Sequence, residues 1–191
     1  VVKNGYLVFE KYYSWGSPEK FAVVHSVTKS VMSALIGIAL DKGYLKSLDQ
    51  KLPDFFPEYI TDNLDPRTRE ISLRHLLTMS AGFRWNDRGS EMRFWYSSSN
   101  WAKFTIELPQ DSNPGEKFTY NTSISHLLSI ILSKATETST LEFARQNLFE
   151  SLGIQSAFWH QGPQGYYIGG FGLGLSARDL AKIGFLYLNN G

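Results

Sequence analysis

SVTKSVMSALIGIALDK, residues 26–42, is the stretch from which we infer the architecture of this chain. Gly43 follows it and predicts the end of a helix, because glycine readily adopts the left-handed conformation that closes helices. No charged residue stands between Lys29 and Asp41, so most of the helix surface is expected to pack against other elements. The pattern predicts a central helix that needs apolar cover on several sides.

Turn and capping signals divide the rest of the chain into short elements. The Asn4-Gly5 pair predicts a hairpin within residues 1–13. Apolar spacing and capping residues predict further helices that start at residue 47, span 72–79 and 122–135, run from 139 to about 152, and start at 176. Only 157–159 and 166–168 remain as candidate strands. Because this is too little sheet to cover the central helix, we expect more sheet beyond residue 191.

Residues 81–113 are predicted to form a long irregular segment, and such segments in compact proteins are often binding loops or lids. The part from Phe83 to Phe104 holds seven aromatic residues. Most of them are expected to anchor the segment to the core, and one or two to contact substrate. Trp85 is our candidate for a substrate contact.

The composition excludes several classes of function. With 19 Lys and Arg against 18 Asp and Glu, the net charge of +1 provides no basic surface for nucleic acid. The absence of cysteine excludes disulfides, thiolate metal sites and a cysteine nucleophile. No apolar run is long enough to span a membrane, and no metal-binding motif is present, so we expect no span, no metal and no other cofactor. The compartment, cytoplasmic or extracytoplasmic, and the oligomeric state stay open.

A Ser-x-x-Lys motif occurs twice, at residues 17–20 and 26–29. The first copy stands in a loop beside a proline, where nothing fixes the distance between its serine and its lysine. The second copy, Ser26 and Lys29, falls in the first turn of the predicted central helix. Residues three positions apart share a helix face, so these two side chains are within reach of each other.

This second pair has the chemistry of a nucleophile and its base. The positive end of the helix and an apolar environment both favour the neutral amine of Lys29, which can then take the proton of the Ser26 hydroxyl. Unpaired amides of the same helical turn would help to hold an oxyanion. The alternative is structural: Ser26 caps the helix and Lys29 extends to solvent.

Tyr120 is a third candidate. It stands in PGEKFTYNT, residues 114–122, where a turn and a short extended piece lead into a predicted helix. A phenol at such a junction can relay a proton between a lysine, a serine and a leaving group. The alternative is that one of ten tyrosines falls at a helix entry without any role.

Four segments in one order resemble the serine β-lactamase-related family, which comprises class C β-lactamases, DD-peptidases, esterases and 6-aminohexanoate-oligomer hydrolases. They are SVTK at 26–29, LLTMSAG at 76–82, PGEKFTYNTSISHLLSIIL at 114–132 and GGFGLGLSARDLAKIGFLYLNNG at 169–191. The resemblance implies that Ser26 is the acyl-accepting nucleophile, Lys29 the general base and Tyr120 the acid/base of the second motif. It is closest to the esterase and amide-hydrolase branch, whose substrates are small esters or amides.

The resemblance also implies an α/β (α+β) fold of the β-lactamase/transpeptidase type, with an antiparallel sheet flanked by helices and a helical or loop lid. Residues 1–191 would then be the N-terminal part of such a domain, with the sheet incomplete and the C-terminal part absent. Residues 1–45 would supply the sheet edge and the nucleophile helix. Residues 46–191 would form a mainly helical region with its lid at 81–113.

Two departures from the family pattern affect these expectations. The second motif is commonly Tyr-x-Asn, whereas Thr122 stands at the third position here and Asn121 comes one place early. Thr122 is therefore our candidate for the substrate contact of this motif, and hydrolysis of an antibiotic is less expected. The third motif, Lys or His followed by Thr or Ser and Gly on a strand, is not found. His160-Gln161-Gly162 resembles it, but its flanking residues are typical of turns.

Other constellations are weaker. No Gly-x-Ser-x-Gly elbow supports an α/β-hydrolase, and His25, His75 and His126 are expected to be structural. The segment from Gly172 to Ala177 mimics a dinucleotide-binding turn, but close backbone packing explains its glycines better.

We therefore expect a serine hydrolase that works through an acyl-enzyme. Without the third motif, the 191-residue chain by itself is expected to be inactive or severely impaired. The alternative is a non-catalytic, penicillin-binding-like relative that binds peptide or cell-wall ligands in the same cleft.

Overall fold

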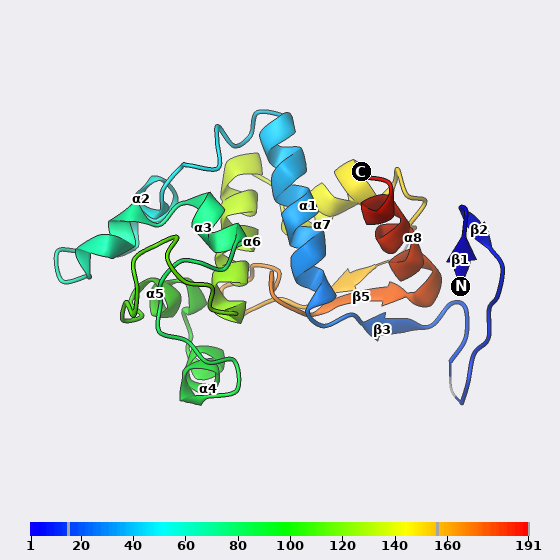
Figure 1. Ribbon diagram of the computed structural model, residues 1–191, viewed down its shortest axis with the longest axis horizontal. Coiled ribbons are helices and arrows are strands. Elements are labelled where there is room, and N and C mark those ends of the chain that lie inside the picture. Colours follow the sequence, from blue (N-terminus) through cyan, green and yellow to red (C-terminus); the bar gives the residue numbers. More distant parts are fainter. Residues whose placement is uncertain (15, 156, 191) are drawn as a thin grey trace.

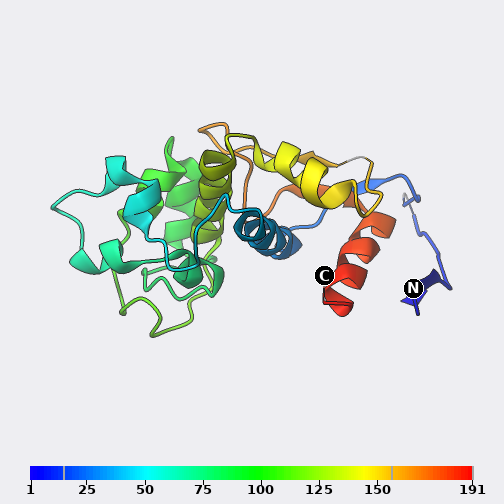
Figure 2. The ribbon, with the colours of Figure 1, turned by 90° about the horizontal axis from the view of Figure 1, so that it is seen from above.

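The long helix α1 (Val27–Asp41) stands at the centre of the molecule, in a computed structural model that describes residues 1–14, 16–155 and 157–190. Figures 1 and 2 show helices on one side of α1, and a small sheet with further helices on the other. The first side contains α2 (Leu52–Phe55), α3 (Leu73–Leu77), α4 (Ser90–Ser97), α5 (Trp101–Ile106), α6 (Thr122–Thr136) and the short 3-10 helices η1 (Pro57–Tyr59) and η2 (Pro66–Glu70). The second side contains α7 (Thr140–Ala144), its π-helical continuation η3 (Arg145–Phe149) and α8 (Ala177–Leu188).

Helices α1 and α6 pack against each other and form the middle of the core. Val31, Leu35 and Ile36 of α1 are fully buried, and so are Leu127 and Ile131 of α6. Their apolar residues recur with helical spacing, which is why the two predicted helices, 26–42 and 122–135, are confirmed within a residue or two.

The opposite face of α1 carries small residues that are exposed among the described residues. Ser30, Ser33 and Gly37 lie on it, and Tyr187 of α8 donates a hydrogen bond of 2.6 Å from its hydroxyl to the Ser30 carbonyl. The expectation of apolar cover on most sides of α1 is therefore met on the α6 side and only in part on the α8 side.

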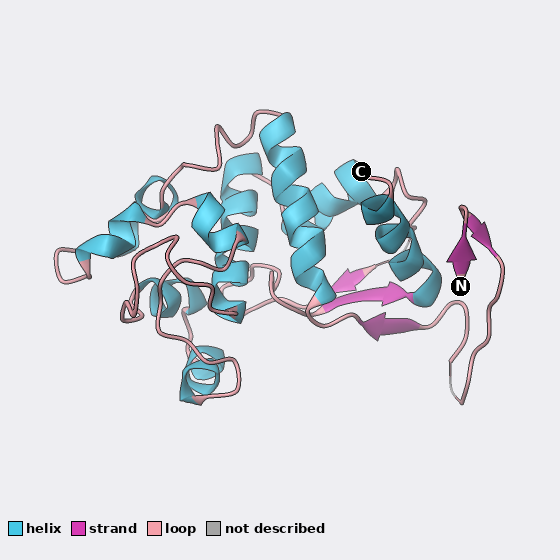
Figure 3. Ribbon diagram, viewed as in Figure 1, coloured by secondary structure: helices cyan, strands magenta, loops and turns pink. Residues whose placement is uncertain are grey.

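The sheet has three antiparallel strands in the order β3 (Phe21–Val23), β5 (Leu173–Ser176) and β4 (Phe158–Trp159), shown in magenta in Figure 3. The central strand β5 is fully buried and pairs Leu175 with Ala22 on one side, and Gly174 with Phe158 on the other. A side chain at Gly174 would collide with the Phe158 ring, so this glycine permits the close approach of β4. Small antiparallel strands flanked by helices confirm the predicted mixed α/β class.

The N-terminal hairpin is also confirmed. Strands β1 (Val2–Lys3) and β2 (Tyr6–Leu7) pair around Asn4 and Gly5, whose φ angles of 52° and 80° are those of the tight turn that an Asn-Gly pair favours. The hairpin forms a two-stranded sheet of its own beside α8, as Figure 2 shows.

Capping residues confirm several of the predicted helix starts. Ser139 and Ser176 accept hydrogen bonds from the amides of Glu142 and Asp179, and so begin α7 and α8. The predicted helix at 72–79 is observed as α3.

Three local predictions are wrong. The helix expected from residue 47 is a turn, in which the Gln50 side chain accepts the amide of Lys46 at 2.6 Å, and the helix begins only at Leu52. Residues 166–168 form no strand and only an isolated bridge between Gln161 and Tyr167. The segment 81–113, expected to be irregular, contains α4 and α5, and its role as a lid stays a prediction.

Candidate active site

The chain enters α1 through a constrained turn that ends at Ser26. The Val24 amide donates to the Leu173 carbonyl at 2.8 Å, so the entry to the helix is tied to β5. His25 then adopts a φ of 45°, a conformation that costs energy for a residue with a side chain. Ser26 follows as the N-cap residue and is exposed, but its hydroxyl makes no capping hydrogen bond. The capping alternative for Ser26 is therefore not what the structure shows.

The Lys29 amine lies close to Ser26, Gly170 and Tyr120. It donates to the Ser26 hydroxyl at 3.2 Å and to the carbonyl of Gly170 at 2.7 Å, and it lies 5.0 Å from the centre of the Tyr120 ring. The structure thus brings the three predicted catalytic residues together, although they come from α1 and from the loop before α6. Lys29 is partly buried and bound at its amine, so it does not extend freely to solvent.

Tyr120 is held at the entrance to α6 by its neighbour. The Asn121 side chain caps this helix, accepting the amides of Ser123 at 2.9 Å and of Ile124 at 3.3 Å, and the residue is only 2% exposed. The asparagine that comes one place early in the motif is therefore a buried helix cap. Tyr120 itself is 41% exposed, so part of this residue is accessible to an incoming molecule.

The two predicted substrate-binding residues, Thr122 and Trp85, meet at one carboxylate. Asp87 accepts the Thr122 amide at 3.0 Å, the Thr122 hydroxyl at 2.6 Å and the indole N–H of Trp85. Both residues are buried, with exposures of 3% and 7%. This geometry occupies their polar atoms, and substrate contact by either stays a prediction. Asp87 was not among the predicted site residues.

The acceptor of the Lys29 amine belongs to a loop that is pressed against α6. A Cβ atom on Gly169 would collide with the Ser125 carbonyl oxygen, and one on Gly170 would lie 2.7 Å from the Thr122 methyl carbon. Only glycines fit this close approach without a shift of the backbone. The close packing predicted for the segment from Gly172 to Ala177 is supported at Gly174, where a Cβ would collide with the Phe158 ring, and β5 with α8 takes the place of a dinucleotide-binding turn.

The amides of the first turn of α1 are mostly paired, contrary to expectation. Those of Val27, Thr28 and Lys29 donate to carbonyls three residues earlier, at 3.0 to 3.1 Å. The Ser26 amide, which precedes them, has no acceptor among the described residues. One donor for an oxyanion is therefore present at the nucleophile itself.

The tripeptide His160-Gln161-Gly162 follows the edge of the sheet opposite the strand that leads to the nucleophile. It follows the edge strand β4, and β5 separates that strand from β3, which leads to Ser26. A hydrogen bond of 2.9 Å from the Gly162 amide to the Tyr166 carbonyl closes a turn after it. The turn predicted for these residues is therefore present.

His126 is buried in α6 among the rings of Trp95 and Trp101. Burial lowers its pKa from 6.5 to about 4, which the nearby backbone of Tyr167 offsets only in part. Its ring nitrogens find no hydrogen-bond partner among the described residues. His75 accepts the Ser72 amide at 3.2 Å, and burial and Arg74 lower its pKa.

The described residues also bear on other kinds of site. No cluster of histidines and acidic residues that could hold a metal occurs among them, and no helix there is long and apolar enough to cross a bilayer.

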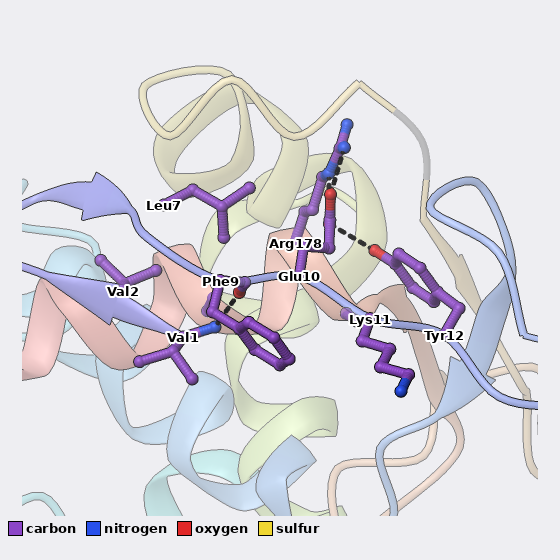
Figure 4. A pocket seen from close by; sticks show the side chains of 10 residues that line it. Val1, Val2, Leu7, Phe9, Glu10, Lys11, Tyr12 and Arg178 are labelled. Carbon is purple, nitrogen blue, oxygen red and sulfur yellow. Dashed lines mark hydrogen bonds and ion pairs between the residues drawn. The ribbon is translucent and has the colours of Figure 1, made fainter.

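A cavity of about 380 Å³ lies between the N-terminal segment and α8 (Figure 4). Glu10 binds Arg178 there at 2.6 Å, and this pairing holds the pKa of Glu10 at about 2. None of the residues that line this cavity belongs to the Ser26 centre.

The chain is similar to known proteins over its whole length. A family model described as Beta-lactamase matches residues 1–191. The chain is 24% identical over 208 aligned positions to the 6-aminohexanoate-dimer hydrolase of Paenarthrobacter ureafaciens, an alignment that covers all of this chain and 52% of that protein.

Solved structures show the same fold. A Bacillus anthracis protein assigned as a 6-aminohexanoate-dimer hydrolase superimposes with a TM-score of 0.85 at 21% identity, over 100% of this chain and 53% of that one. The penicillin-binding protein of Bacillus halodurans superimposes with a TM-score of 0.69 at 16% identity, over 91% and 62% of the two chains. The chain thus spans about half the length of the hydrolases that it matches.

Proposed function

This chain belongs to the β-lactamase family, and we propose that it provides the acylating centre of a serine hydrolase that cleaves an ester or amide bond. One observation carries the proposal: the Lys29 amine lies 3.2 Å from the Ser26 hydroxyl, at the start of a rigid helix and beside Tyr120. A nucleophile within hydrogen-bond reach of a base is the signature of covalent catalysis. The hydrolases among its relatives support the same reaction class.

In the proposed reaction the neutral Lys29 amine keeps one N–H on the Gly170 carbonyl, which leaves its lone pair for the Ser26 proton. The Ser26 oxygen attacks the substrate carbonyl as its proton passes to Lys29. Tyr120 then protonates the leaving group as the carbonyl–leaving-group bond breaks, and Lys29 returns the proton to Tyr120. Water releases the acid from the acyl-enzyme by the same steps in reverse, and Ser26 recovers its proton.

The oxyanion of this reaction needs more than the described residues offer. The Ser26 amide supplies one donor, and enzymes of this kind generally use two preorganised donors. The sequence has no Lys- or His-headed third motif on a strand. We therefore propose that the 191-residue chain alone is inactive or severely impaired. Robust Ser26-dependent hydrolysis of a p-nitrophenyl ester by the isolated chain contradicts this point.

Labelling with a fluorophosphonate tests the nucleophile in the protein at its natural full length. We expect labelling of the wild type, none of Ser26→Ala, and slower labelling of Lys29→Met. Ser33→Ala is a matched control, because Ser33 is another exposed serine of α1 and its variant should label normally. Equal labelling of the wild type and Ser26→Ala refutes the assignment. Peptide or cell-wall ligand binding that survives both site variants, without turnover of any activated ester, supports the non-catalytic alternative instead.

A further inference from the structure

Asp87 joins the segment before α4 to the first residue of α6. Its carboxylate accepts both the amide and the hydroxyl of Thr122, at 3.0 and 2.6 Å, and also the indole N–H of Trp85. Thr122 is 3% exposed and Trp85 7% exposed, while Asp87 itself is half-buried, so these bonds are partly shielded from water. Hydrogen bonds to an ionised acceptor are stronger than neutral ones, and burial strengthens them further.

The carboxylate also suits the helix end that it holds. The Asn121 side chain satisfies the amides of Ser123 and Ile124, and Asp87 satisfies that of Thr122. A negative charge at the positive end of the α6 dipole is favourable. The first turn of α6 is thus fixed from two sides, by a cap within the turn and by a carboxylate 35 positions away.

Two neighbours of Thr122 belong to the proposed catalytic centre. Tyr120 precedes it by two residues in the chain, and its ring lies 5.0 Å from the Lys29 amine. Gly170 lies against it in space, so close that a Cβ would fall 2.7 Å from the Thr122 methyl carbon, and the Gly170 carbonyl binds the Lys29 amine at 2.7 Å. A shift of Thr122 therefore acts most directly on the phenol of Tyr120, which is joined to it through the chain.

We propose that Asp87 is a positioning residue: by holding Thr122 it sets Tyr120 at its working distance from Lys29. The inference rests on the proposed function. The Thr122 hydroxyl and the Trp85 indole N–H then serve to orient this carboxylate. Because Tyr120 protonates the leaving group, loss of the carboxylate slows the reaction most for leaving groups that need a proton.

The first test compares two substrates in the protein at its natural full length. For Asp87→Ala we expect kcat to fall about 100-fold for an alkyl ester and less than about fivefold for the p-nitrophenyl ester of the same acid, with little change in KM. Asp87→Asn, which keeps one acceptor oxygen, should fall between Asp87→Ala and the wild type. Asp111→Ala is the matched control, since Asp111 is an exposed carboxylate from the same predicted lid that pairs with Arg84 at 3.0 Å. Its kinetics should stay unchanged.

Equal losses for the two esters in Asp87→Ala overturn the proposal, because a general loss of folded protein affects both alike. Should Asp87→Ala fail to fold, Thr122→Val decides the matter, since it keeps the side-chain shape and removes only the hydroxyl bond. It should show the same selective loss, in smaller measure, and an unchanged ratio between the two esters overturns the proposal.

A second readout does not depend on turnover. With 3-fluorotyrosine in place of Tyr120, the ¹⁹F resonance should shift or broaden in Asp87→Ala and stay in place in Asp111→Ala and Ser26→Ala. An unmoved resonance in Asp87→Ala overturns the positioning role. If the wild type shows no Ser26-dependent hydrolysis, the proposed function fails, and the ¹⁹F result still decides whether Asp87 positions Tyr120.

Discussion

Lys29 and Gly170 stand 141 positions apart in the chain and are joined by a hydrogen bond of 2.7 Å between the lysine amine and the glycine carbonyl. The bond directs the amine toward Ser26, 3.2 Å away. A backbone carbonyl cannot be removed by substitution, but its position depends on the residue that carries it. The absence of a side chain at Gly170 is thus a condition for the geometry of the proposed base.

Gly170→Ala should therefore slow acylation of Ser26. The new Cβ would lie 2.7 Å from the Thr122 methyl carbon and 3.0 Å from the Thr122 carbonyl oxygen, so the loop must shift. A displacement near 1 Å at a reacting group costs about 100-fold in rate, and we expect a loss of that order in fluorophosphonate labelling. The thermal midpoint of the variant is measured alongside. A labelling rate equal to that of the wild type contradicts the role of the carbonyl.

Gly169→Ala and Gly184→Ala should change stability in opposite directions. A Cβ on Gly169 meets the Ser125 carbonyl, which is backbone and cannot turn away, so we expect the free energy of unfolding to fall by about 2 kcal/mol or more. Gly184 lies within α8 with nothing near its Cβ position, and alanine there should raise the free energy by up to about 1 kcal/mol. Urea titration of both variants checks the signs.

His126→Phe should weaken the response of stability to acid. The unfolded chain binds a proton at His126 near pH 6.5, whereas the buried ring, with a pKa of about 4, resists it. Stability is therefore full above pH 6.5 and is lost as the pH falls toward 4, by about 2 kcal/mol between pH 7 and pH 5. Urea titrations at these two values should show that loss in the wild type.

The His126→Phe variant should lose much less between the same pH values. Some dependence remains, because burial and Arg74 lower the pKa of His75 as well. The control is His160→Phe, in which an exposed histidine is replaced. Equal acid sensitivity of His126→Phe and the wild type would mean that burial does not lower the pKa of His126 as described.

Glu137→Gly should stabilise the protein. Glu137 ends α6 with φ 53° and ψ 25°, a left-handed conformation that costs a residue with a side chain about 1 kcal/mol and costs glycine little. Its negative charge at the helix C-terminus adds a smaller penalty. Glu137→Ala separates the two causes, because it removes the charge and keeps the Cβ. We expect a clear rise in thermal midpoint for glycine and a slight change for alanine.

The sequence predicted the elements whose signals are long or local. The apolar spacing of α1 and α6, the Asn4-Gly5 turn and the capping serines were sufficient for those elements. Helix α5 was missed although its signal was present, since Asn100 caps it by accepting the Lys103 amide at 2.9 Å. Helix α4 begins after Gly89, which has no side chain to give such a signal.

The strands of the sheet carried weaker signals. Strand β3 is three residues long, and β5 contains a glycine that a strand on its own disfavours. β5 forms because it pairs with a strand on each side and because Gly174 leaves room for the Phe158 ring. Both are tertiary contacts, which the local sequence does not reveal.

The candidate site divides in the same way. Ser26 and Lys29 were within reach of prediction because their spacing alone places them on one face of a helix. The parts supplied by Asp87 and Gly170 were not, because their partners stand 35 and 141 positions away. The pairing of the first-turn amides of α1 was missed for a local reason. The amides of Val27 to Lys29 donate to carbonyls three residues earlier, and of the amides from Ser26 to Lys29 only that of Ser26 has no acceptor among the described residues.

The pairing of β3 with β5 has a consequence for biosynthesis. It joins residues 21–23 to residues 174–176, so the strand that leads into Ser26 gains its partner only after nearly all of this sequence has left the ribosome. Contacts so distant in the chain form late in folding. A nascent chain that stops before residue 173 contains both α1 and α6, but it lacks the strand that pairs with the residues before Ser26. The candidate centre is thus completed only once the chain has been made through β5, long after its nucleophile.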